Sequence, residues 1–190
     1  MVKIFVVDNG GQWTHREWRT LRDFDVETKI IANTTSYTDL VKEDINGLIL
    51  SGGAPRIGLK SVLGNIDEYL RKANFPILGI CAGHQYMAHF FGGVAKPSKK
   101  PEYGKIELII TKDNDIFKDV PKKSIVWESH NDEVTKLPHN FICLAKSESC
   151  KIQAMKHKNK LFYGLQFHPE VEHTEYGKLI FKNFIQLCKE

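Results

Sequence analysis

The chain has 190 residues, 42% of them hydrophobic and 11% aromatic, so it is long enough to bury one full core. Its net charge of +4 comes from Lys and Arg spread along the sequence, and the lack of a basic stripe argues against a nucleic-acid partner. No apolar stretch approaches the roughly 20 residues that span a bilayer, so we expect no membrane partner and a cytoplasmic location.

No stretch of the sequence is typical of a linker, so we expect a single domain over residues 1–190. The four cysteines show no CxxC spacing and are too few for a disulfide scaffold at this length. We therefore expect reduced thiols and no metal site.

Strand and helix patterns alternate through the first half of the chain. Four short apolar runs predict β-strands: KIFVVD (3–8), VETKII (26–31), GLILS (47–51) and PILGIC (76–81). Apolar residues at helical spacing predict helices over 12–24 and 61–73. This alternation favours an α/β fold whose mostly parallel central sheet is flanked by helices.

The pattern changes from about residue 104, where β-rich segments follow one another with short turns. They are KIELIIT (105–111), SIVW (124–127), FICLAKS (141–147), IQAMKH (152–157) and LFYGLQF (161–167). We expect them to add antiparallel strands to the sheet, and we expect a final helix over 175–187.

The stretch LGICAGHQ (78–85) places Cys81 between Gly79 and Gly83, directly after a predicted strand and before an apolar helix. This is the cysteine form of the nucleophile elbow, in which glycines permit a tight strand-to-helix turn. The positive end of the following helix favours the thiolate. The alternative is that Cys81 is a buried small hydrophobic residue, the usual place of a free cysteine.

A nucleophilic thiol needs a base, and the base needs an orienting group. In LQFHPEVEH (165–173), His168 ends a strand-like run, and Glu170 lies two residues on, which is the same side of an extended segment. We expect the Glu170 carboxylate to orient His168; the alternative for His168 is an ordinary surface histidine. The other candidate base is His130 in WESHNDEV (127–134), which otherwise reads as a polar turn after a strand.

The loop after GLILS ends in two glycines and a proline, so its backbone amides can approach a ligand closely. If strand 47–51 lies beside strand 76–81, the amides of Gly53 and Ala82 converge near the Cys81 sulfur as an oxyanion hole. A plain turn is the alternative for this loop.

The motifs DNGGQ, SGGAP, GICAGHQ, SHNDEV and QFHPEV, in this order along the whole chain, resemble the triad-type, or class I, glutamine amidotransferase family. The resemblance implies that Cys81 attacks the side-chain amide of glutamine, with His168 as the acid–base group and Glu170 orienting it. It also implies substrate-binding roles for Gly52, Gln85, Ser129, His130, Asn131 and Asp132, with Asp132 as partner of the substrate ammonium.

Within the family, DNGGQ and WESHNDEV look like the glutaminase subunits of GMP synthases in which that subunit is a separate polypeptide. The resemblance implies a partner, an ATP-pyrophosphatase subunit that uses ATP and Mg²⁺ and receives ammonia to convert xanthosine monophosphate (XMP) to GMP. The sequence contains no G-x-x-x-x-G-K-[ST] phosphate loop, so we expect no cofactor on this chain.

Two positions depart from the family pattern: Ala54 precedes Pro55 where proline usually follows the paired glycines, and Ala82 replaces a bulkier residue. Three alternatives stay open. The chain could serve anthranilate, aminodeoxychorismate or carbamoyl phosphate synthesis; it could be a cysteine peptidase-like hydrolase; or it could be a non-catalytic regulatory subunit.

Overall fold

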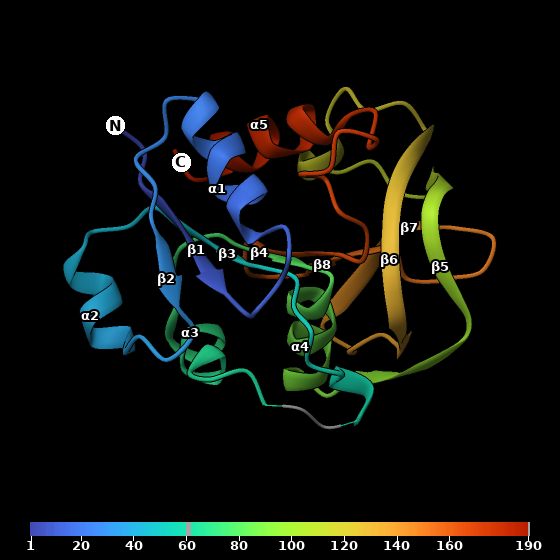
Figure 1. Cartoon of the computed structure of the whole chain (residues 1–190), viewed down its shortest axis with the longest axis horizontal. Helices are drawn as coiled ribbons and strands as arrows, with labels where there is room; N and C mark the ends of the chain where they lie inside the picture. Colours follow the sequence, from blue (N-terminus) through green and yellow to red (C-terminus); the bar gives the residue numbers. More distant parts are fainter. Residues whose placement is uncertain (60–61, 190) are drawn as a thin grey trace.

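The computed structural model describes residues 1–59 and 62–189 and has an α/β fold (Figure 1). Within these residues one sheet has nine strands in the order β2-β1-β3-β4-β9-β8-β7-β5-β6. The strands are β1 (Ile4–Asp8), β2 (Ile30–Ala32), β3 (Gly47–Leu50), β4 (Ile77–Ile80), β5 (Val94–Ile110), β6 (Lys123–Lys136), β7 (Phe141–Lys146), β8 (Ala154–His157) and β9 (Phe162–Leu165). The helices are α1 (Thr14–Asp23), α2 (Tyr37–Lys42), α3 (Ile66–Lys72), α4 (Ala82–Phe90) and α5 (Gly177–Leu187), with short 3₁₀ turns at Ile57–Leu59 and Asp115–Phe117.

The first four strands and β9 form the parallel half of the sheet. Three of the four strands predicted in the first half of the sequence are therefore confirmed, and the fourth, predicted over 26–31, is confirmed only at its end, where β2 covers Ile30–Ala32. The expectation for LFYGLQF was wrong in one respect, because β9 pairs with β4 in the parallel direction. β9 is antiparallel to β8, its neighbour in sequence, as expected. Its parallel partner β4 is more than 80 residues earlier in the chain, so local sequence does not indicate this pairing.

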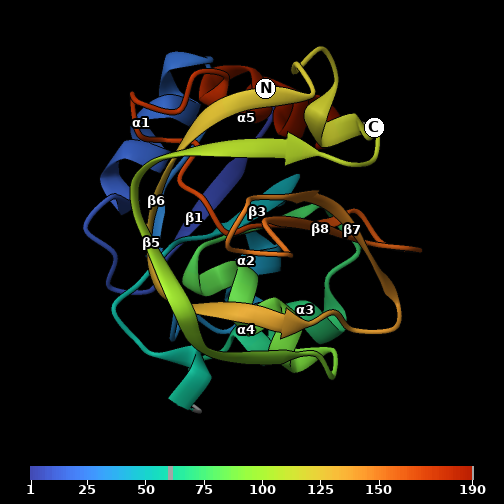
Figure 2. The same ribbon diagram turned by 90° about the vertical axis from the view of Figure 1, so that its right-hand side faces the viewer.

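The antiparallel half is built on β5 and β6, two long strands that curve across one end of the molecule (Figure 2). β5 begins at Val94, ten residues before the predicted change of pattern, and includes the polar run at Lys99 and Lys100. The alternative of a polar turn at residues 129–132 was wrong, since these residues lie inside β6. Their partners on β5 stabilise the strand: His130 is in register with Glu102, and the chain is extended on both sides of it.

Helices cover both faces of the sheet (Figure 1). Alternate residues of β1 enter different cores: Ile4 and Val6 pack in the cluster that contains residues of α1 and α5, whereas Phe5 and Val7 pack with residues of α2, α3 and α4. This follows from the two-residue period of side chains along a strand. The parallel strands are consequently apolar on both faces, which explains their continuous hydrophobic runs.

The predicted helices at 12–24 and 175–187 are confirmed, with ends that differ by one or two residues. α3 occupies the end of the predicted helix 61–73, and residue 61 lies outside the described residues. α2 was not predicted; Ser36 caps it by accepting a hydrogen bond from the amide of Asp39.

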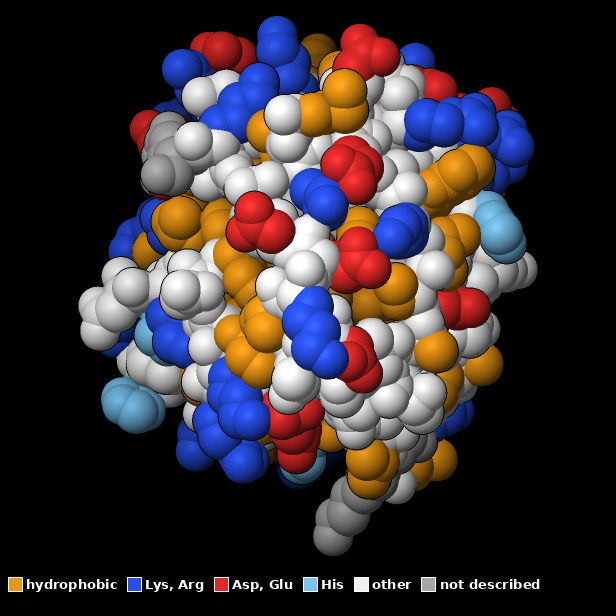
Figure 3. All heavy atoms as spheres, turned by 90° about the vertical axis from the view of Figure 1, so that its left-hand side faces the viewer, with side chains coloured by type: hydrophobic (Ala, Val, Ile, Leu, Met, Phe, Trp, Pro, Cys, Tyr) orange, Lys and Arg blue, Asp and Glu red, His pale blue; other side chains and the backbone are white. Residues whose placement is uncertain are grey.

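Lys, Arg, Asp and Glu side chains are interspersed on the face that lies at the left of Figure 1, and this face is shown in Figure 3. Such mixing of charges agrees with a solvated surface. Within the described part of the chain, no helix combines the length and the apolar character needed to cross a membrane.

Candidate active site

Cys81 lies at the turn between β4 and α4, at the carboxyl edge of the parallel strands. Its backbone has φ 49° and ψ −104°, a conformation that non-glycine residues rarely adopt. Strain of this kind is typical of functional sites. The predicted elbow is therefore confirmed as a local structure.

The two glycines of the elbow are required by close backbone contacts. A Cβ atom on Gly79 would lie 2.7 Å from the carbonyl carbon of Gly83, and one on Gly83 would lie 2.3 Å from the carbonyl oxygen of Leu50. Backbone atoms of adjacent elements cannot move aside cheaply, so α4 can lie this close to the ends of β4 and β3 only with glycine at both positions.

The thiol is largely enclosed, since Cys81 is only 8% exposed. Its sulfur lies 3.9 Å from the carbonyl oxygen of Ser129 on β6 and 3.7 Å from Nε2 of Gln166. The sulfur nevertheless lines two hollows, so substrate can reach it from the surface.

His168 and Glu170 form the second part of the site. The Nδ1 atom of His168 lies 2.6 Å from Oε1 of Glu170, as the sequence predicted. The geometric reason was different, because residues 169 and 170 form a turn after β9 instead of an extended segment. The amide of Val171 donates a hydrogen bond to the carbonyl oxygen of His168, which closes this turn.

Burial opposes a positive charge on His168, but the Glu170 carboxylate outweighs it and raises the pKa of His168 well above its ordinary value. The thiol of Cys81 adds to this increase. The other ring nitrogen, Nε2, is buried without a hydrogen bond of ordinary geometry to the described residues. It is thus free to exchange a proton with a thiol or a substrate atom.

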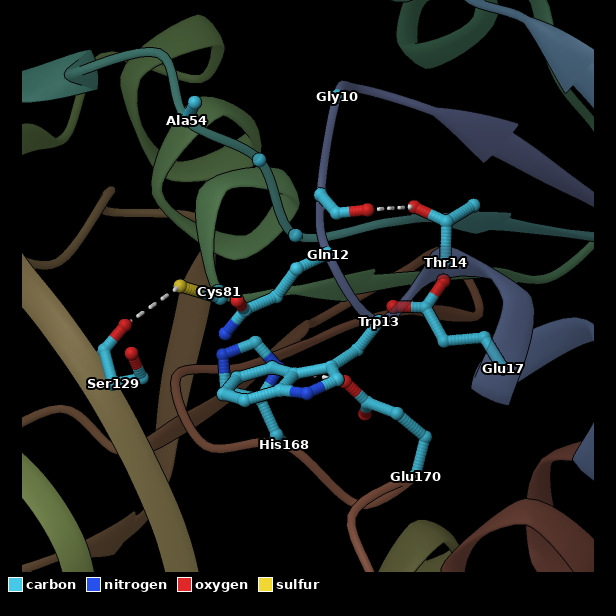
Figure 4. A pocket seen from close by; sticks show the side chains of 13 residues that line it. Gly10, Gln12, Trp13, Thr14, Glu17, Ala54, Cys81, Ser129, His168 and Glu170 are labelled. Atoms are coloured by element: carbon cyan, nitrogen blue, oxygen red, sulfur yellow. Dashed lines mark hydrogen bonds and ion pairs between the residues drawn. The ribbon is translucent and has the colours of Figure 1, made fainter.

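The His168 ring is held from several elements (Figure 4). Trp13, which precedes α1, meets it edge-on with ring centroids 4.4 Å apart. The amide of His168 donates to the carbonyl oxygen of Trp127 on β6, and the Thr174 hydroxyl donates to the carbonyl oxygen of His168. The imidazole is consequently positioned before any substrate binds.

The SGGAP loop follows β3, which lies directly beside β4 as the oxyanion prediction required. Asn9 clamps this loop: its side chain donates to the carbonyl oxygen of Ser51, and its own amide donates to the Ser51 hydroxyl. A Cβ atom on Gly53 would lie 2.3 Å from the carbonyl oxygen of Asn9. Gly53 therefore allows the SGGAP loop to pack closely against the loop that contains Asn9, and these contacts restrict the SGGAP loop.

Two hollows meet at Cys81. The larger has a volume of about 230 Å³ and extends from the sulfur toward the start of α1, past His168 and Glu170 (Figure 4). The smaller, of about 160 Å³, lies between the SGGAP loop, α4 and β6. The residues with predicted substrate-binding roles mostly line this smaller hollow: Gln85, Ser129, His130, Asn131 and Asp132. Gly52 lines the larger one.

Several of these side chains already have partners within the chain. The amide nitrogen of Gln85 donates to the carbonyl oxygen of Asp132 and to Oε1 of Gln166. The Asp132 carboxylate accepts hydrogen bonds from Arg56 and from the amide of Gly58. Asn131 points outward, where it accepts a hydrogen bond from Tyr103.

His130 is not a second base near the sulfur. Its Nε2 atom lies 2.9 Å from Oε2 of Glu102, and its Nδ1 atom lies 3.0 Å from the carbonyl oxygen of Asp132. Both ring nitrogens are therefore occupied in a buried polar network.

Ligand atoms of Glu102, His130 and Cys150 lie within 4.8 Å of one another, a spacing that could hold a metal ion. The Glu102 carboxylate, however, already accepts hydrogen bonds from Ser147, Ser149 and Gln153 in addition to its contact with His130. Burial also raises the pKa of the Cys150 thiol, which disfavours the thiolate that a metal requires. The cluster is best described as a hydrogen-bonded support for β6.

Sequence reasoning missed Trp13 and Glu17, which line the larger hollow. They are four residues apart, so they share one side of the helical turn at the start of α1. Burial, followed by the Glu170 carboxylate, raises the pKa of Glu17 well above its usual value, so its protonated form is favoured. The available signal was the position of Glu17, which lies four residues from both Trp13 and Leu21 and therefore on the apolar side of the predicted helix.

Comparison with known proteins identifies the family. Residues 5–187 match the family described as glutamine amidotransferase class-I. The chain belongs to this family. The amidotransferase fold and the nucleophile elbow are therefore found together in a sequence that carries all three expected triad residues.

Relatives of this amidotransferase cover it from end to end. A protein of Pyrococcus abyssi, named as a subunit of glutamine-hydrolyzing GMP synthase, is 51% identical over 191 residues, covering 98% of this chain and 99% of the relative. A Thermoplasma acidophilum protein of the same name is 48% identical over 189 residues, covering 99% and 94%.

Solved structures give the same result. The crystal structure of a protein from Thermoplasma acidophilum, provisionally described as a GMP synthase subunit, superimposes with a TM-score of 0.93 at 48% identity, covering 100% of this amidotransferase and 94% of that chain. A glutamine amidotransferase from Thermotoga maritima has a TM-score of 0.75 at 21% identity, covering 99% and 82%, and shows the shared fold.

Proposed function

We propose that this chain is the glutamine-hydrolysing subunit of a GMP synthase. The observation that carries the proposal is the position of Cys81 on a strained elbow beside a His168 ring whose Nδ1 is held by Glu170. Its family membership and the names of its full-length relatives support the same activity.

In the proposed reaction, the Cys81 sulfur attacks the side-chain amide carbon of glutamine, and His168 takes the thiol proton. The carbon–nitrogen bond then breaks, and His168 returns the proton to the departing ammonia, which leaves a thioester. Water, deprotonated by His168, attacks the thioester, so that glutamate forms and the thiol is restored. Glu170 keeps the imidazole in the tautomer and orientation that both steps require.

The amides of Gly53 and Ala82 are the proposed donors to the tetrahedral oxyanion. Ala82 is the first residue of α4, and the first amides of a helix have no partner within the helix. Gly53 lies on the loop after β3, the strand next to β4, and both residues line the smaller hollow with Cys81. Such donors contribute about 3 to 4 kcal/mol each to the transition state.

The smaller hollow is the proposed glutamine pocket, with the main part of its wall from β6. Asp132 has the only carboxylate among the described residues that line it, and this carboxylate is the proposed partner of the substrate ammonium. Gln85 supports the wall by its hydrogen bond to the Asp132 backbone. Ser129, His130 and Asn131 contribute through the strand, and Gly52 contributes from the loop on the other side of the sulfur.

The proposed partner is a separate ATP-pyrophosphatase subunit that binds ATP, Mg²⁺ and XMP and uses the ammonia to form GMP. The relatives are named as one subunit of a synthase, which supports a partner of some kind. We propose that the reaction takes place in the cytoplasm, where the Cys81 thiol would stay reduced. The whole described chain serves, in this proposal, as one glutaminase domain.

The test is steady-state glutamate release by the isolated chain, then by the chain with an ATP-pyrophosphatase subunit, ATP, Mg²⁺ and XMP. We expect glutamate and GMP to form together in the complete mixture. Cys81→Ala should abolish both with glutamine, while free ammonia should still yield GMP. Formation of anthranilate, aminodeoxychorismate or carbamoyl phosphate with another partner, and no GMP, would contradict the proposal.

A further inference from the structure

Arg56 and Asp132 form an ion pair on the wall of the smaller hollow beside Cys81. The Nε atom of Arg56 lies 2.8 Å from Oδ1 of Asp132, and its Nη2 atom donates to the same oxygen. The amide of Gly58 donates to Oδ2 at 3.0 Å. The Asp132 side chain is 2% exposed and that of Arg56 is 42% exposed, so the guanidinium is the accessible end of the pair.

This pair supplies the permanent charges of the hollow. The other lining residues are Gly53, Ala54, Pro55, Cys81, Ala82, Gln85, Ser129, His130 and Asn131. Among them, His130 has both ring nitrogens already bonded, to Glu102 and to the Asp132 backbone. The hollow therefore offers one accessible cation and one carboxylate.

A substrate of the proposed reaction carries matching charges. When the side-chain amide of glutamine lies at the Cys81 sulfur, its α-ammonium and α-carboxylate lie together at the opposite end of the molecule. A carboxylate that leaves water without a partner is strongly disfavoured. The Arg56 guanidinium has five N–H donors in a planar fork, and its contact with Asp132 uses only the Nε and Nη2 groups.

We propose that Arg56 binds the α-carboxylate of glutamine, beside the Asp132 carboxylate already assigned to the α-ammonium under the proposed function. This inference rests on the proposed function and extends it, since it assigns a specificity residue that recognises a free amino acid. Arg56 and Asp132 pair with each other, and glutamine inserts its two charges beside theirs. A glutamine residue inside a peptide lacks both charges and is therefore excluded.

The experiment compares L-glutamine with L-glutamine α-amide, which lacks the α-carboxylate, as substrates of the wild type, Arg56→Ala and a control. The control is Arg71→Ala, because Arg71 lies on α3 and does not line the hollow. All are assayed in the complex with the pyrophosphatase subunit. For Arg56→Ala we expect KM for L-glutamine to rise about 10-fold, the lower range for a hydrogen bond to a charged group, because Arg56 is partly exposed. For the same variant, KM for the α-amide and kcat for both compounds should change by less than about 2-fold.

An equal loss with both compounds, or no change with either, overturns the inference. Circular dichroism and thermal unfolding show whether Arg56→Ala is folded; if it is not, Arg56→Gln makes the same comparison with the side chain's length retained. Glutamine binding to the Cys81→Ala variant, measured by calorimetry with and without the Arg56 change, gives a readout independent of turnover and should weaken about 10-fold. A wild-type complex that hydrolyses neither compound contradicts the proposed function itself.

Discussion

Oε1 of Glu170 and Nδ1 of His168 lie 2.6 Å apart within a single turn of the chain, both side chains almost fully buried. The pair holds the imidazole by its rear nitrogen and leaves Nε2 available on the opposite side of the ring. Because this contact bridges only two residues, its geometry depends on the turn, and the turn is fixed by the hydrogen bonds of His168 to β6 and to Thr174.

The first prediction separates the roles of the two residues. His168→Ala should lower kcat for glutamine by several orders of magnitude, because it removes the group that moves both protons. Glu170→Gln should cost less, because the imidazole keeps its contacts with Trp13 and β6. Glutamate release in the complete complex is the measurement. A Glu170→Gln variant as inactive as His168→Ala would contradict the orienting role.

The second prediction concerns pH and stability. The folded pKa of His168 is raised by Glu170, so the pair's contribution is fully present below the unfolded pKa of about 6.5 and is lost as pH rises through the folded pKa. Denaturant unfolding should therefore show a larger deficit for Glu170→Gln at pH 6 than at pH 10. The matched control is Glu172→Gln. Oε1 of Glu172 lies 3.9 Å from Nε2 of His173, and both side chains are exposed. A deficit for Glu170→Gln that is equal at both pH values would contradict this origin of the pKa shift.

The third prediction tests the packing of the SGGAP loop. In Gly53→Ala the new Cβ would collide with the carbonyl oxygen of Asn9, so the loop must move and take the Gly53 amide with it. Loss of one oxyanion donor lowers kcat by about 100- to 1,000-fold. Ala32→Gly is the control, since Ala32 is exposed on β2 and lines neither hollow, and it should stay within about 3-fold of the wild type. Full activity in Gly53→Ala would show that this amide does not serve the reaction.

The elbow and the oxyanion loop could be predicted because each is a local pattern at the end of a buried strand. Glycines two residues before and after Cys81 indicate a tight strand-to-helix turn. Adjacent parallel strands such as β3 and β4 bring their carboxyl ends together, which places the SGGAP loop near this turn. His168 and Glu170 were equally local, and their contact was correctly predicted although the extended geometry assumed for it was wrong.

The features that sequence did not reveal depend on contacts between distant residues. Residues 129–132 look like a turn in the sequence, but they pair with β5, where Glu102 and Tyr103 are the partners of the His130 and Asn131 side chains. Arg56 and Asp132 are 76 residues apart, so nothing local connects them. Trp13 and Glu17 fit an ordinary amphipathic helix, and their place beside His168 and Glu170 appears only when α1 packs on the sheet.

The last prediction concerns Glu17, whose side chain is fully buried at the wall of the larger hollow, with Oε2 lacking a hydrogen-bond partner in the described chain. Its titratable neighbours are Glu170, His168 and Cys81. Burial and then Glu170 raise its folded pKa, so between the unfolded pKa of about 4.3 and the folded value the native state holds the extra proton. By linkage, the free energy of unfolding of the wild type falls as pH rises through this window.

Glu17→Gln removes the ionisable group and keeps the shape of the side chain. The variant should therefore have a larger free energy of unfolding than the wild type, and this difference should grow from pH 4.5 to pH 8. We expect at least about 1 kcal/mol at pH 8, the lower range for a buried polar group without a partner. Denaturant titrations at the two pH values make the measurement, and Glu148→Gln, at an exposed glutamate, should show no such trend. A wild-type advantage at pH 8 would mean that the ionised Glu17 carboxylate stabilises the fold, and the protonated form inferred from its burial would then be wrong.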